Sequence, residues 1–149
     1  MSDTHPQTLT PRLVVRNAPA AIDFYTRVYG AELLERYAMP DGHVVHALLA
    51  LGDARFSLAE EAPDWHTLGA QSIGDSPVIL QLSVDDPDAT AARAVELGAE
   101  VVFPIRDQFY GRREGRIRDP FGHLWILGRV IEDVSPEEME RRIAAFAES

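Results

Sequence analysis

The sequence contains neither cysteine nor lysine. None of its 149 residues is cysteine, and all 14 basic residues are arginine. Without cysteine the chain has no disulfide, no thiolate nucleophile and no cysteine-based zinc site. Without lysine it has no side chain for Schiff-base catalysis and no P-loop lysine. Several enzyme classes are therefore excluded before any motif is considered.

Long apolar runs are also missing. No run approaches the roughly 20 residues that a membrane span needs, and the opening residues MSDTHPQT lack both parts of a secretory signal. We therefore predict no membrane partner and a cytoplasmic location. Residues 1–8 show no periodicity and are predicted to be a flexible tail, while a hydrophobic content of 46% suffices for a folded core.

The charge is strongly one-sided. The 24 carboxylates outnumber the 14 arginines, which gives a formal net charge of −10. Such a surface repels nucleic acid, so no nucleic-acid partner is expected. The one basic cluster, between residues 112 and 118, is interrupted by Glu114. The negative charge is explained by solubility alone, or it favours a cationic ligand.

The chain repeats itself at a constant offset of 68 residues. Residues 14–33 read VVRNAPAAIDFYTRVYGAEL, and residues 82–101 read LSVDDPDATAARAVELGAEV. Both segments run from an apolar strand through a polar cap, a proline and an amphipathic helix to a glycine and a new strand. The repeat predicts a pseudo-symmetric protein built from two similar modules.

The first copy predicts a βαβββ module over residues 9–59. Strands are expected at 9–16, 32–39, 43–51 and 54–59 from apolar alternation and turn signals. The helix between the first two strands is capped by Asn17 and ends at Gly30. Residues 60–77 contain two prolines and two glycines without a clear period, so they are predicted to be a linker loop.

The second copy predicts the same order over residues 78–130. Strands are expected at 78–84, 100–105, 111–119 and 123–130, and the helix is capped by Asp85 or Asp86. Residues 131–149 are predicted to form a C-terminal helix that begins at the capping box Ser135-Pro136-Glu137-Glu138. The fold class is therefore α+β, with two βαβββ modules in tandem and a final helix.

Two short motifs lie at informative places in this pattern. Residues 21–25 read AIDFY and are followed by YGA at 29–31, and residues 119–125 read DPFGHLW. With the paired modules, these motifs make residues 9–130 resemble the glyoxalase/bleomycin-resistance family, also called the vicinal oxygen chelate superfamily. The DPFG segment is also explained as a turn between antiparallel strands.

The resemblance implies curved mixed sheets of four strands, each with a helix on its convex side and a cavity on its concave side. It also implies a homodimer, which is common in the family. The family's enzymes hold a divalent metal with four side chains, usually His, Glu or Gln. One comes from the first strand and one from the fourth strand of each module, and the metal acts as a Lewis acid.

The matching positions of this sequence carry none of those ligands. They hold Thr10, Ser57, Ile79 (or Val78) and Ile126. Shifting a strand by one residue does not restore the set, and it would turn the side chain to the other face. We therefore expect no metal and no cofactor.

The histidines do not predict a metal site elsewhere. His43 and His46 lie three residues apart on one predicted strand, so their side chains point to opposite faces. No Ser-His-Asp or Gly-x-Ser-x-Gly arrangement is visible either. The sequence therefore predicts no catalytic residue.

These observations favour a metal-independent protein that sequesters a small molecule, such as an antibiotic or a similar aromatic or cationic ligand. The residues expected to bind it lie on the concave faces or on aromatic segments beside them: Arg12, Arg55, Ser57, Trp65, Gln81, Phe109, Tyr110, Arg112 and Ile126. Arg12 and Arg55 are equally explained by surface ion pairs. Trp125 has the opposite parity to Ile126 and is expected to pack under a helix.

Two alternatives stay open. The first is an enzyme of the same superfamily, of lyase, isomerase or dioxygenase type, in which Tyr110, Arg112, Glu114 or His123 acts as acid, base or oxyanion partner. The second is an assembly protein that uses its final helix. Met139, Ile143 and Phe146 form one apolar stripe there, which is also explained by docking to its own domain or to a dimer mate.

Overall fold

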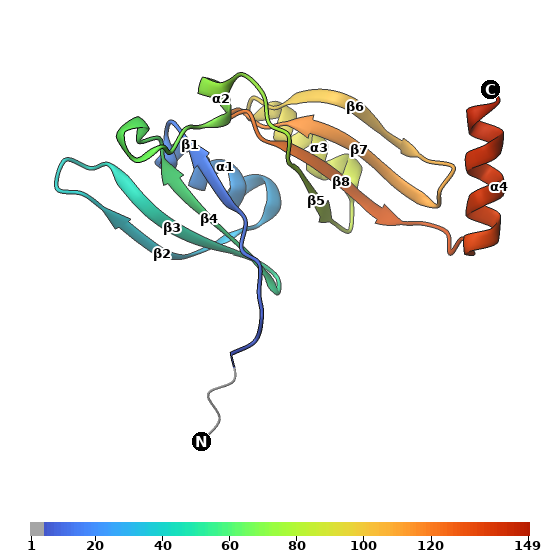
Figure 1. Ribbon diagram of the computed structural model, residues 1–149, viewed down its shortest axis with the longest axis horizontal. Coiled ribbons are helices and arrows are strands. Elements are labelled where there is room, and N and C mark those ends of the chain that lie inside the picture. Colours follow the sequence, from blue (N-terminus) through green and yellow to red (C-terminus); the bar gives the residue numbers. More distant parts are fainter. Residues whose placement is uncertain (1–4) are drawn as a thin grey trace. The chain divides into compact units, whose positions relative to one another are not determined.

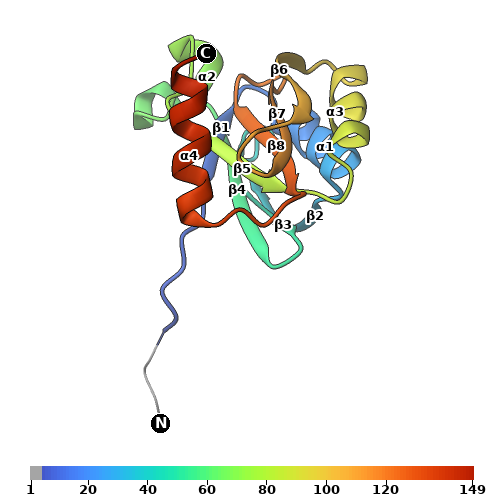
Figure 2. The same cartoon turned by 90° about the vertical axis from the view of Figure 1, so that its right-hand side faces the viewer.

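The computed structural model describes residues 5–149 and divides the chain between Ile73 and Gly74 into two compact units (Figure 1). Residues 1–4 of the predicted tail lie outside the described part, and residues 5–8 have no regular structure. Residues 5–11 run away from the first unit (Figure 2). Within the described chain, no helix is both long enough and apolar enough to cross a membrane.

The first unit is a βαβββ module with a short helical extension. Its elements are β1 (Arg12–Val15), α1 (Ala18–Tyr29), β2 (Glu32–Ala38), β3 (Val44–Leu51), β4 (Ala54–Glu60), the 3-10 helix η1 (Pro63–Trp65) and α2 (Ala70–Ile73). The strand order is β1-β4-β3-β2, with β1 parallel to β4 and the other neighbours antiparallel.

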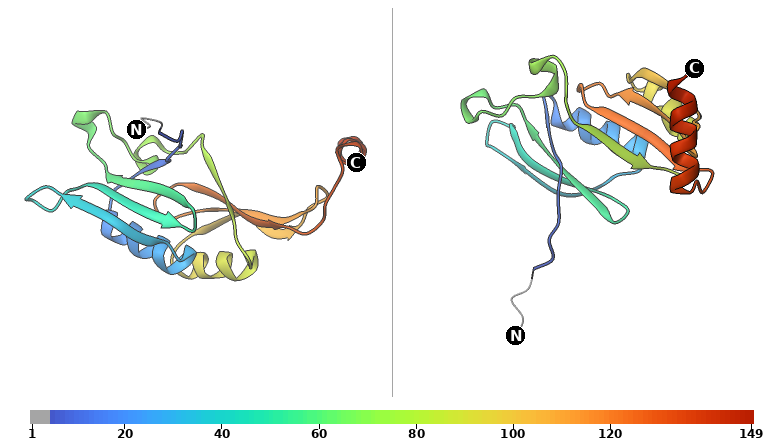
Figure 3. Two further views of the ribbon diagram at one scale, coloured as in Figure 1. Left: turned by 90° about the horizontal axis from the view of Figure 1, so that it is seen from below. Right: turned by 45° about the vertical axis from the view of Figure 1, so that its right-hand side comes forward.

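Helix α1 forms where the predicted caps lie. The Asn17 carboxamide accepts from the amide of Ala20 at 3.1 Å, and Gly30 ends the helix with a φ of 74°, a conformation that favours glycine. The helix covers one face of the sheet (Figure 3). Tyr25 and Val28 are fully buried there with strand residues such as Leu58, which forms the core of the unit.

The predicted linker contains structure that its composition did not indicate. Both η1 and α2 lie within residues 60–77. Local hydrogen bonds stabilise them: the Glu61 carboxylate accepts from the amide of Gly69 at 2.8 Å, and Arg16 donates to the Ser72 hydroxyl at 3.0 Å. Such contacts leave no hydrophobic period in the sequence.

The second unit repeats the module and adds a helix. Its elements are β5 (Ile79–Ser83), α3 (Pro87–Glu96), β6 (Glu100–Asp107), β7 (Arg112–Arg118), β8 (Leu124–Val130) and α4 (Pro136–Ala147). The strand order β5-β8-β7-β6 matches that of the first unit, and α3 lies on one face of the sheet (Figure 3). The predicted fold class is confirmed, and the cap of α3 is Asp86.

The DPFG motif is a structural element of the second unit. One carboxylate oxygen of Asp119 accepts from the amides of Phe121 and His123, and the other accepts from the indole N–H of Trp125 at 2.8 Å. Asp119 and Trp125 are both buried. The turn and the buried tryptophan were both predicted, and these contacts account for the motif without a catalytic role.

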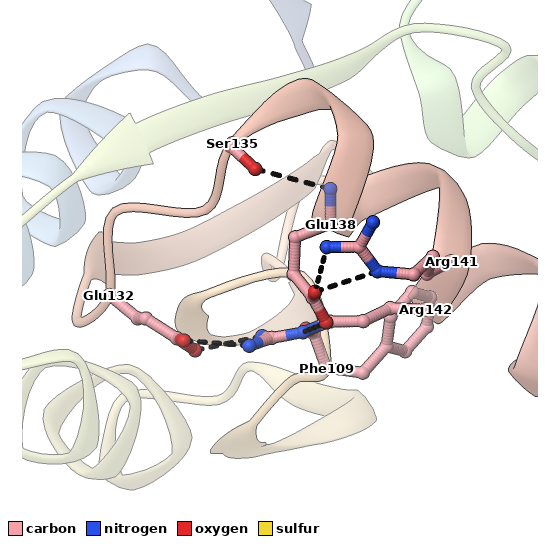
Figure 4. A network of polar contacts seen from close by, with 6 residues as sticks. All are labelled: Phe109, Glu132, Ser135, Glu138, Arg141 and Arg142. Atoms are coloured by element: carbon pink, nitrogen blue, oxygen red, sulfur yellow. Dashed lines mark hydrogen bonds and ion pairs between the residues drawn. The ribbon is translucent and has the colours of Figure 1, made fainter.

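Helix α4 is held by polar contacts rather than by a core (Figure 4). Arg142 donates to both oxygens of Glu132 and to the backbone carbonyl of Phe109, each within 2.8 Å. The Phe146 ring stacks on Phe109 at a centroid distance of 4.9 Å. The predicted apolar stripe stays largely open, because Ile143 and Phe146 are 51% and 63% exposed.

Candidate small-molecule site

A cavity of about 350 Å³ lies on the second unit's sheet. Its apolar lining consists of Phe103, Pro104, Gly115 and Ile126. Its polar lining consists of Arg106, Gln108, Tyr110, Glu114 and Arg116. All these residues come from β6, β7, β8 or the turn between β6 and β7, so one module builds the whole site.

The shape of the cavity depends on an irregular β6. The pairing of β6 with β7 shifts between Val101 and Phe103 and again between Phe103 and Arg106, as at a β-bulge, which bends a strand. Gly115 allows β6 to approach, because a Cβ there would lie 2.5 Å from the carbonyl oxygen of Phe103. A side chain at this position would push β6 away and change the cavity.

Glu114 is the central polar group of the cavity. Its side chain points from β7 and is nearly buried, with 7% of the residue exposed. Tyr110 donates its hydroxyl to Oε1, and Arg112 donates Nε–H to Oε2 at 2.8 Å. Gln108 donates to the backbone carbonyl of Glu114 at 3.1 Å. Both carboxylate oxygens are therefore engaged, as a buried carboxylate requires.

A glycine makes room for this carboxylate. Gly128 on β8 lies opposite Glu114. A Cβ at Gly128 would lie 2.5 Å from the Glu114 Cβ, closer than real Cβ contacts come, and 3.1 Å from Oε2, which is a tight contact. At the equivalent place of the first unit, β4 carries Ala59, which pairs with Val14 as Gly128 pairs with Ser83.

Tyr110 stays protonated over the physiological pH range. Burial, the hydrogen bond to Glu114 and the negative charge of that carboxylate raise the pKa of Tyr110 to about 12. The phenol is therefore a hydrogen-bond donor and an aromatic wall of the cavity, and it is not available as a base near neutral pH.

Two arginines complete the lining. The Arg116 guanidinium carbon lies 5.3 Å from the centre of the Phe103 ring, within cation–π range. Arg116 Nε and Arg112 Nη2 are buried and have no hydrogen-bond partner among residues 5–149. Arg106 lines the same cavity from β6. Buried donors without partners are uncommon and mark a site that a further acceptor would satisfy.

The corresponding face of the first unit carries a closed polar network. Arg12 donates to the Ser57 hydroxyl at 3.2 Å and to the Val45 carbonyl at 2.8 Å, and its Nη1 lies 3.1 Å from His46 Nδ1. Because arginine can only donate, His46 Nδ1 accepts and its Nε2–H donates to Glu35 at 3.1 Å. In this network, Arg12 and His46 find their hydrogen-bond acceptors within the first unit.

The structure brings some of the predicted ligand-binding residues together and separates others. Tyr110 and Ile126 line the cavity, and Arg112 adjoins it through Glu114. Gln81 pairs with Ile126 on the neighbouring strand. The remaining predicted residues do not line this cavity: Arg12, Ser57 and the exposed Arg55 lie on the first sheet, Trp65 lies in η1, and Phe109 packs against α4.

The strand pairing shows which residues lie beside the positions that the resemblance gives for the family's metal ligands. Thr10 lies before β1, and the residue paired with Ser57 is Arg12. Likewise Gln81, rather than Ile79, pairs with Ile126. A shift of two residues keeps the side chain on the same face. Among Arg12, Ser57, Gln81 and Ile126, only Gln81 is one of the family's usual ligand types, and a guanidinium and an aliphatic side chain do not fit a divalent cation. No three His, Asp or Glu side chains of the described chain form a group that could hold a metal ion.

Sequence reasoning missed six lining residues: Phe103, Pro104, Arg106, Gln108, Gly115 and Arg116. Arg116 pairs with Ile126 across β7 and β8, but this register is not visible from the sequence. Phe103 and Arg106 lie three residues apart, which places side chains on opposite faces of a regular strand. The pairing shift in β6 brings both to the cavity.

The family model described as the Glyoxalase/Bleomycin resistance protein/Dioxygenase superfamily matches residues 6–127. The chain belongs to this superfamily. An uncharacterized superfamily relative from Mycobacterium bovis is 37% identical over 140 residues, which cover 92% of each chain.

Solved structures agree with this assignment. The chain is similar to TioX from Micromonospora sp. ML1, with a TM-score of 0.62 and 26% identity over 87% of this chain and all of TioX. It is also similar in fold to the fosfomycin resistance protein FosX from Mesorhizobium loti, with a TM-score of 0.60 and 18% identity over 85% of this chain and 93% of FosX.

Proposed function

We propose that the chain is a metal-independent binding protein that sequesters a small molecule in the cavity of its second unit. The observation that supports this proposal is a cavity of about 350 Å³ whose polar side chains Gln108, Tyr110 and Glu114 are already held in place by hydrogen bonds. Small-molecule sites are typically preformed hollows with volumes from about 300 Å³, lined by apolar groups and a few placed polar ones. The volume suits a ligand of one or two rings.

The aromatic lining supports a planar ligand. Phe103 and Tyr110 stand on different segments of the cavity, and each stacked aromatic contact adds about 1 kcal/mol beyond area burial. Antibiotics and similar drugs offer such rings, and the family description includes bleomycin resistance proteins. FosX, which shares the fold, is described as a fosfomycin resistance protein. Both are consistent with an interaction between this chain and a drug-like molecule.

Binding accounts for the site better than catalysis does. Glu114 already accepts two hydrogen bonds, and Tyr110 donates its only hydroxyl proton to it. These hydrogen bonds give both groups a structural role in the cavity. His123 lies in the turn before β8 and does not line the cavity. Turnover of a bound compound would nevertheless favour the enzyme alternative.

A thermal-shift screen tests the proposal. The protein would be heated with a panel of aromatic drugs, with EDTA, and with zinc, nickel, manganese and iron(II) salts. A ligand that binds only the folded state should raise the Tm by several degrees at 100 times its Kd. Metals and EDTA should leave the Tm unchanged. A stoichiometric metal that raises the Tm would contradict the proposal.

A pair of variants locates the binding site. Phe103→Ala should remove the stabilisation by the aromatic ligand. Tyr37→Ala is the matched control, because Tyr37 is equally exposed on the corresponding strand of the first unit, at 58% against 57%. If Phe103→Ala retains the full ligand-induced shift, the ligand binds elsewhere. Homodimerisation stays a prediction, which sedimentation of the same protein measures.

A further inference from the structure

We infer that the cavity of the second unit selects an anionic ligand, in which a carboxylate, sulfonate or phosphonate group is attached to a planar ring. This inference rests on the proposed function and names the chemical class of its ligand. The net charge of −10 favours a cationic ligand at the level of the sequence. The groups that face the cavity have the opposite balance.

The arginines of the cavity lack the partners that most other arginines have. In a chain with ten more carboxylates than arginines, ion pairs engage Arg16, Arg27, Arg112, Arg113, Arg118, Arg141 and Arg142. Arg106 and Arg116 line the cavity, and neither forms a salt bridge or a side-chain hydrogen bond within residues 5–149. Arg106 and Arg116 therefore face the same cavity, and neither is paired with a carboxylate of the described chain.

The one carboxylate in the lining does not offset them. Glu114 contributes one negative charge, which Arg112 compensates through the 2.8 Å ion pair. Arg106 and Arg116 remain, so these four groups carry a net charge of +2 (three arginines minus one glutamate). A cationic ligand would meet two guanidinium groups and a carboxylate that is already paired with Arg112.

The buried donors point to where the anion would bind. Arg116 Nε–H is buried without an acceptor, and its guanidinium is held against the Phe103 ring. An oxyanion beside Arg116 would accept charge-assisted hydrogen bonds from its guanidinium group, and such bonds are stronger than neutral ones. A ring attached to the anion would then reach the aromatic lining. The acidic outer surface is screened within about 10 Å at 0.1 M salt, so the groups in the cavity decide the preference.

Isothermal titration with three matched probes tests the inference. The probes are 1-naphthoate, its neutral analogue 1-naphthamide and the cation 1-naphthylmethylammonium, which share one ring system. We expect naphthoate to bind at least about tenfold more tightly than naphthamide, because charge-assisted hydrogen bonds contribute that much, and the ammonium probe to bind most weakly. Raising the salt concentration should weaken only the naphthoate.

Variants assign the preference to Arg116. Arg116→Gln should remove the difference between naphthoate and naphthamide, since glutamine is uncharged but retains much of the side chain's bulk. Arg129→Gln is the matched control, because Arg129 lies on β8 but does not line the cavity. It should behave like the parent protein. Circular dichroism melts establish that both variants fold.

Each outcome has a defined meaning. Equal binding of the acid and the amide, or tightest binding of the ammonium probe, overturns the anion preference and leaves the binding function standing. A preference for the acid that persists unchanged in Arg116→Gln overturns the assignment to this arginine. If none of the three probes binds, both the anion inference and the proposed aromatic binding site are wrong.

Discussion

The two units share one scaffold and use its open face in different ways. In each sheet, a row of four paired residues runs from the module's first strand at one edge to its second strand at the other edge. They are Arg12, Ser57, Leu48 and Glu35 in the first unit, and Gln81, Ile126, Arg116 and Phe103 in the second. Each row thus contains one arginine, but on different strands.

The position of the arginine decides what the face can do. Arg12 on β1 has Ser57, His46 and a backbone carbonyl within reach, so it makes three hydrogen bonds within its own unit. Arg116 on β7 is flanked in its row by Ile126 and Phe103, neither of which accepts a hydrogen bond from a guanidinium. Within the described chain, Arg116 thus lacks the acceptors that Arg12 has, and this difference is the reason why we propose Arg116 as the ligand-binding arginine.

The largest difference in stability loss is expected between one glutamate of each unit, Glu114 and Glu35. Glu114→Gln removes the charge that pairs with Arg112 and leaves a largely buried guanidinium without it. We expect a loss of about 3 kcal/mol in the free energy of unfolding. Glu35→Gln is the matched change in the first unit, where the side chain is 45% exposed, and it should cost less than about 1 kcal/mol. Urea unfolding measures both; equal losses would contradict the contrast.

A methyl group at position 128 should have the next largest effect. Gly128→Ala places a Cβ within 2.5 Å of the Glu114 Cβ, and overpacking of this kind costs about 2 kcal/mol. It should also abolish ligand binding, because Glu114 must move. Ala59 shows that the first unit already accommodates this methyl group. A Gly128→Ala protein with unchanged stability and binding would exclude the steric account of the site.

Tyr110 provides a smaller effect with a pH signature. Tyr110→Phe removes one donor from a buried carboxylate, at a cost of about 1 kcal/mol. The raised pKa means that the stability contributed by the Tyr110 proton is fully present below the unfolded value of about 10. It is lost as the pH rises through the folded value of about 12. Ultraviolet titration of the parent protein should contain a component near pH 12 from Tyr110, and the variant should lack that component.

The smallest effect is expected for Arg12. Arg12→Gln disturbs hydrogen bonds that are partly exposed, so the loss of stability should stay below about 1 kcal/mol. Binding of 1-naphthoate should change less than twofold. A large loss of binding would contradict this expectation and would instead support the sequence-based prediction that Arg12 and Ser57 contact the ligand.

The fold was largely predictable because its signals are local. The caps Asn17 and Ser135, the glycine at position 30 and the DPFG turn each determine backbone geometry within a few residues. The candidate site was predictable only in part. Tyr110 and Ile126 follow from strand parity and from an aromatic segment beside the sheet, and both line the cavity.

The rest of the site depends on contacts that no local pattern encodes. The pairing shift in β6 brings Phe103 and Arg106 to one hollow, although their spacing predicts opposite faces. The roles of Gly115 and Gly128 depend on how closely neighbouring strands approach. Strand register and bulges are properties of the folded sheet, so these residues require the structure.

The most direct test of the account is a nuclear magnetic resonance titration of the 15N-labelled protein with 1-naphthoate. We predict saturable shifts of the backbone amides of β6, β7 and β8 around Phe103, Tyr110 and Glu114, together with the Arg116 side-chain Nε–H resonance, and unchanged spectra on addition of EDTA. Shifts confined to the first unit, or binding that requires a divalent metal, would contradict the account.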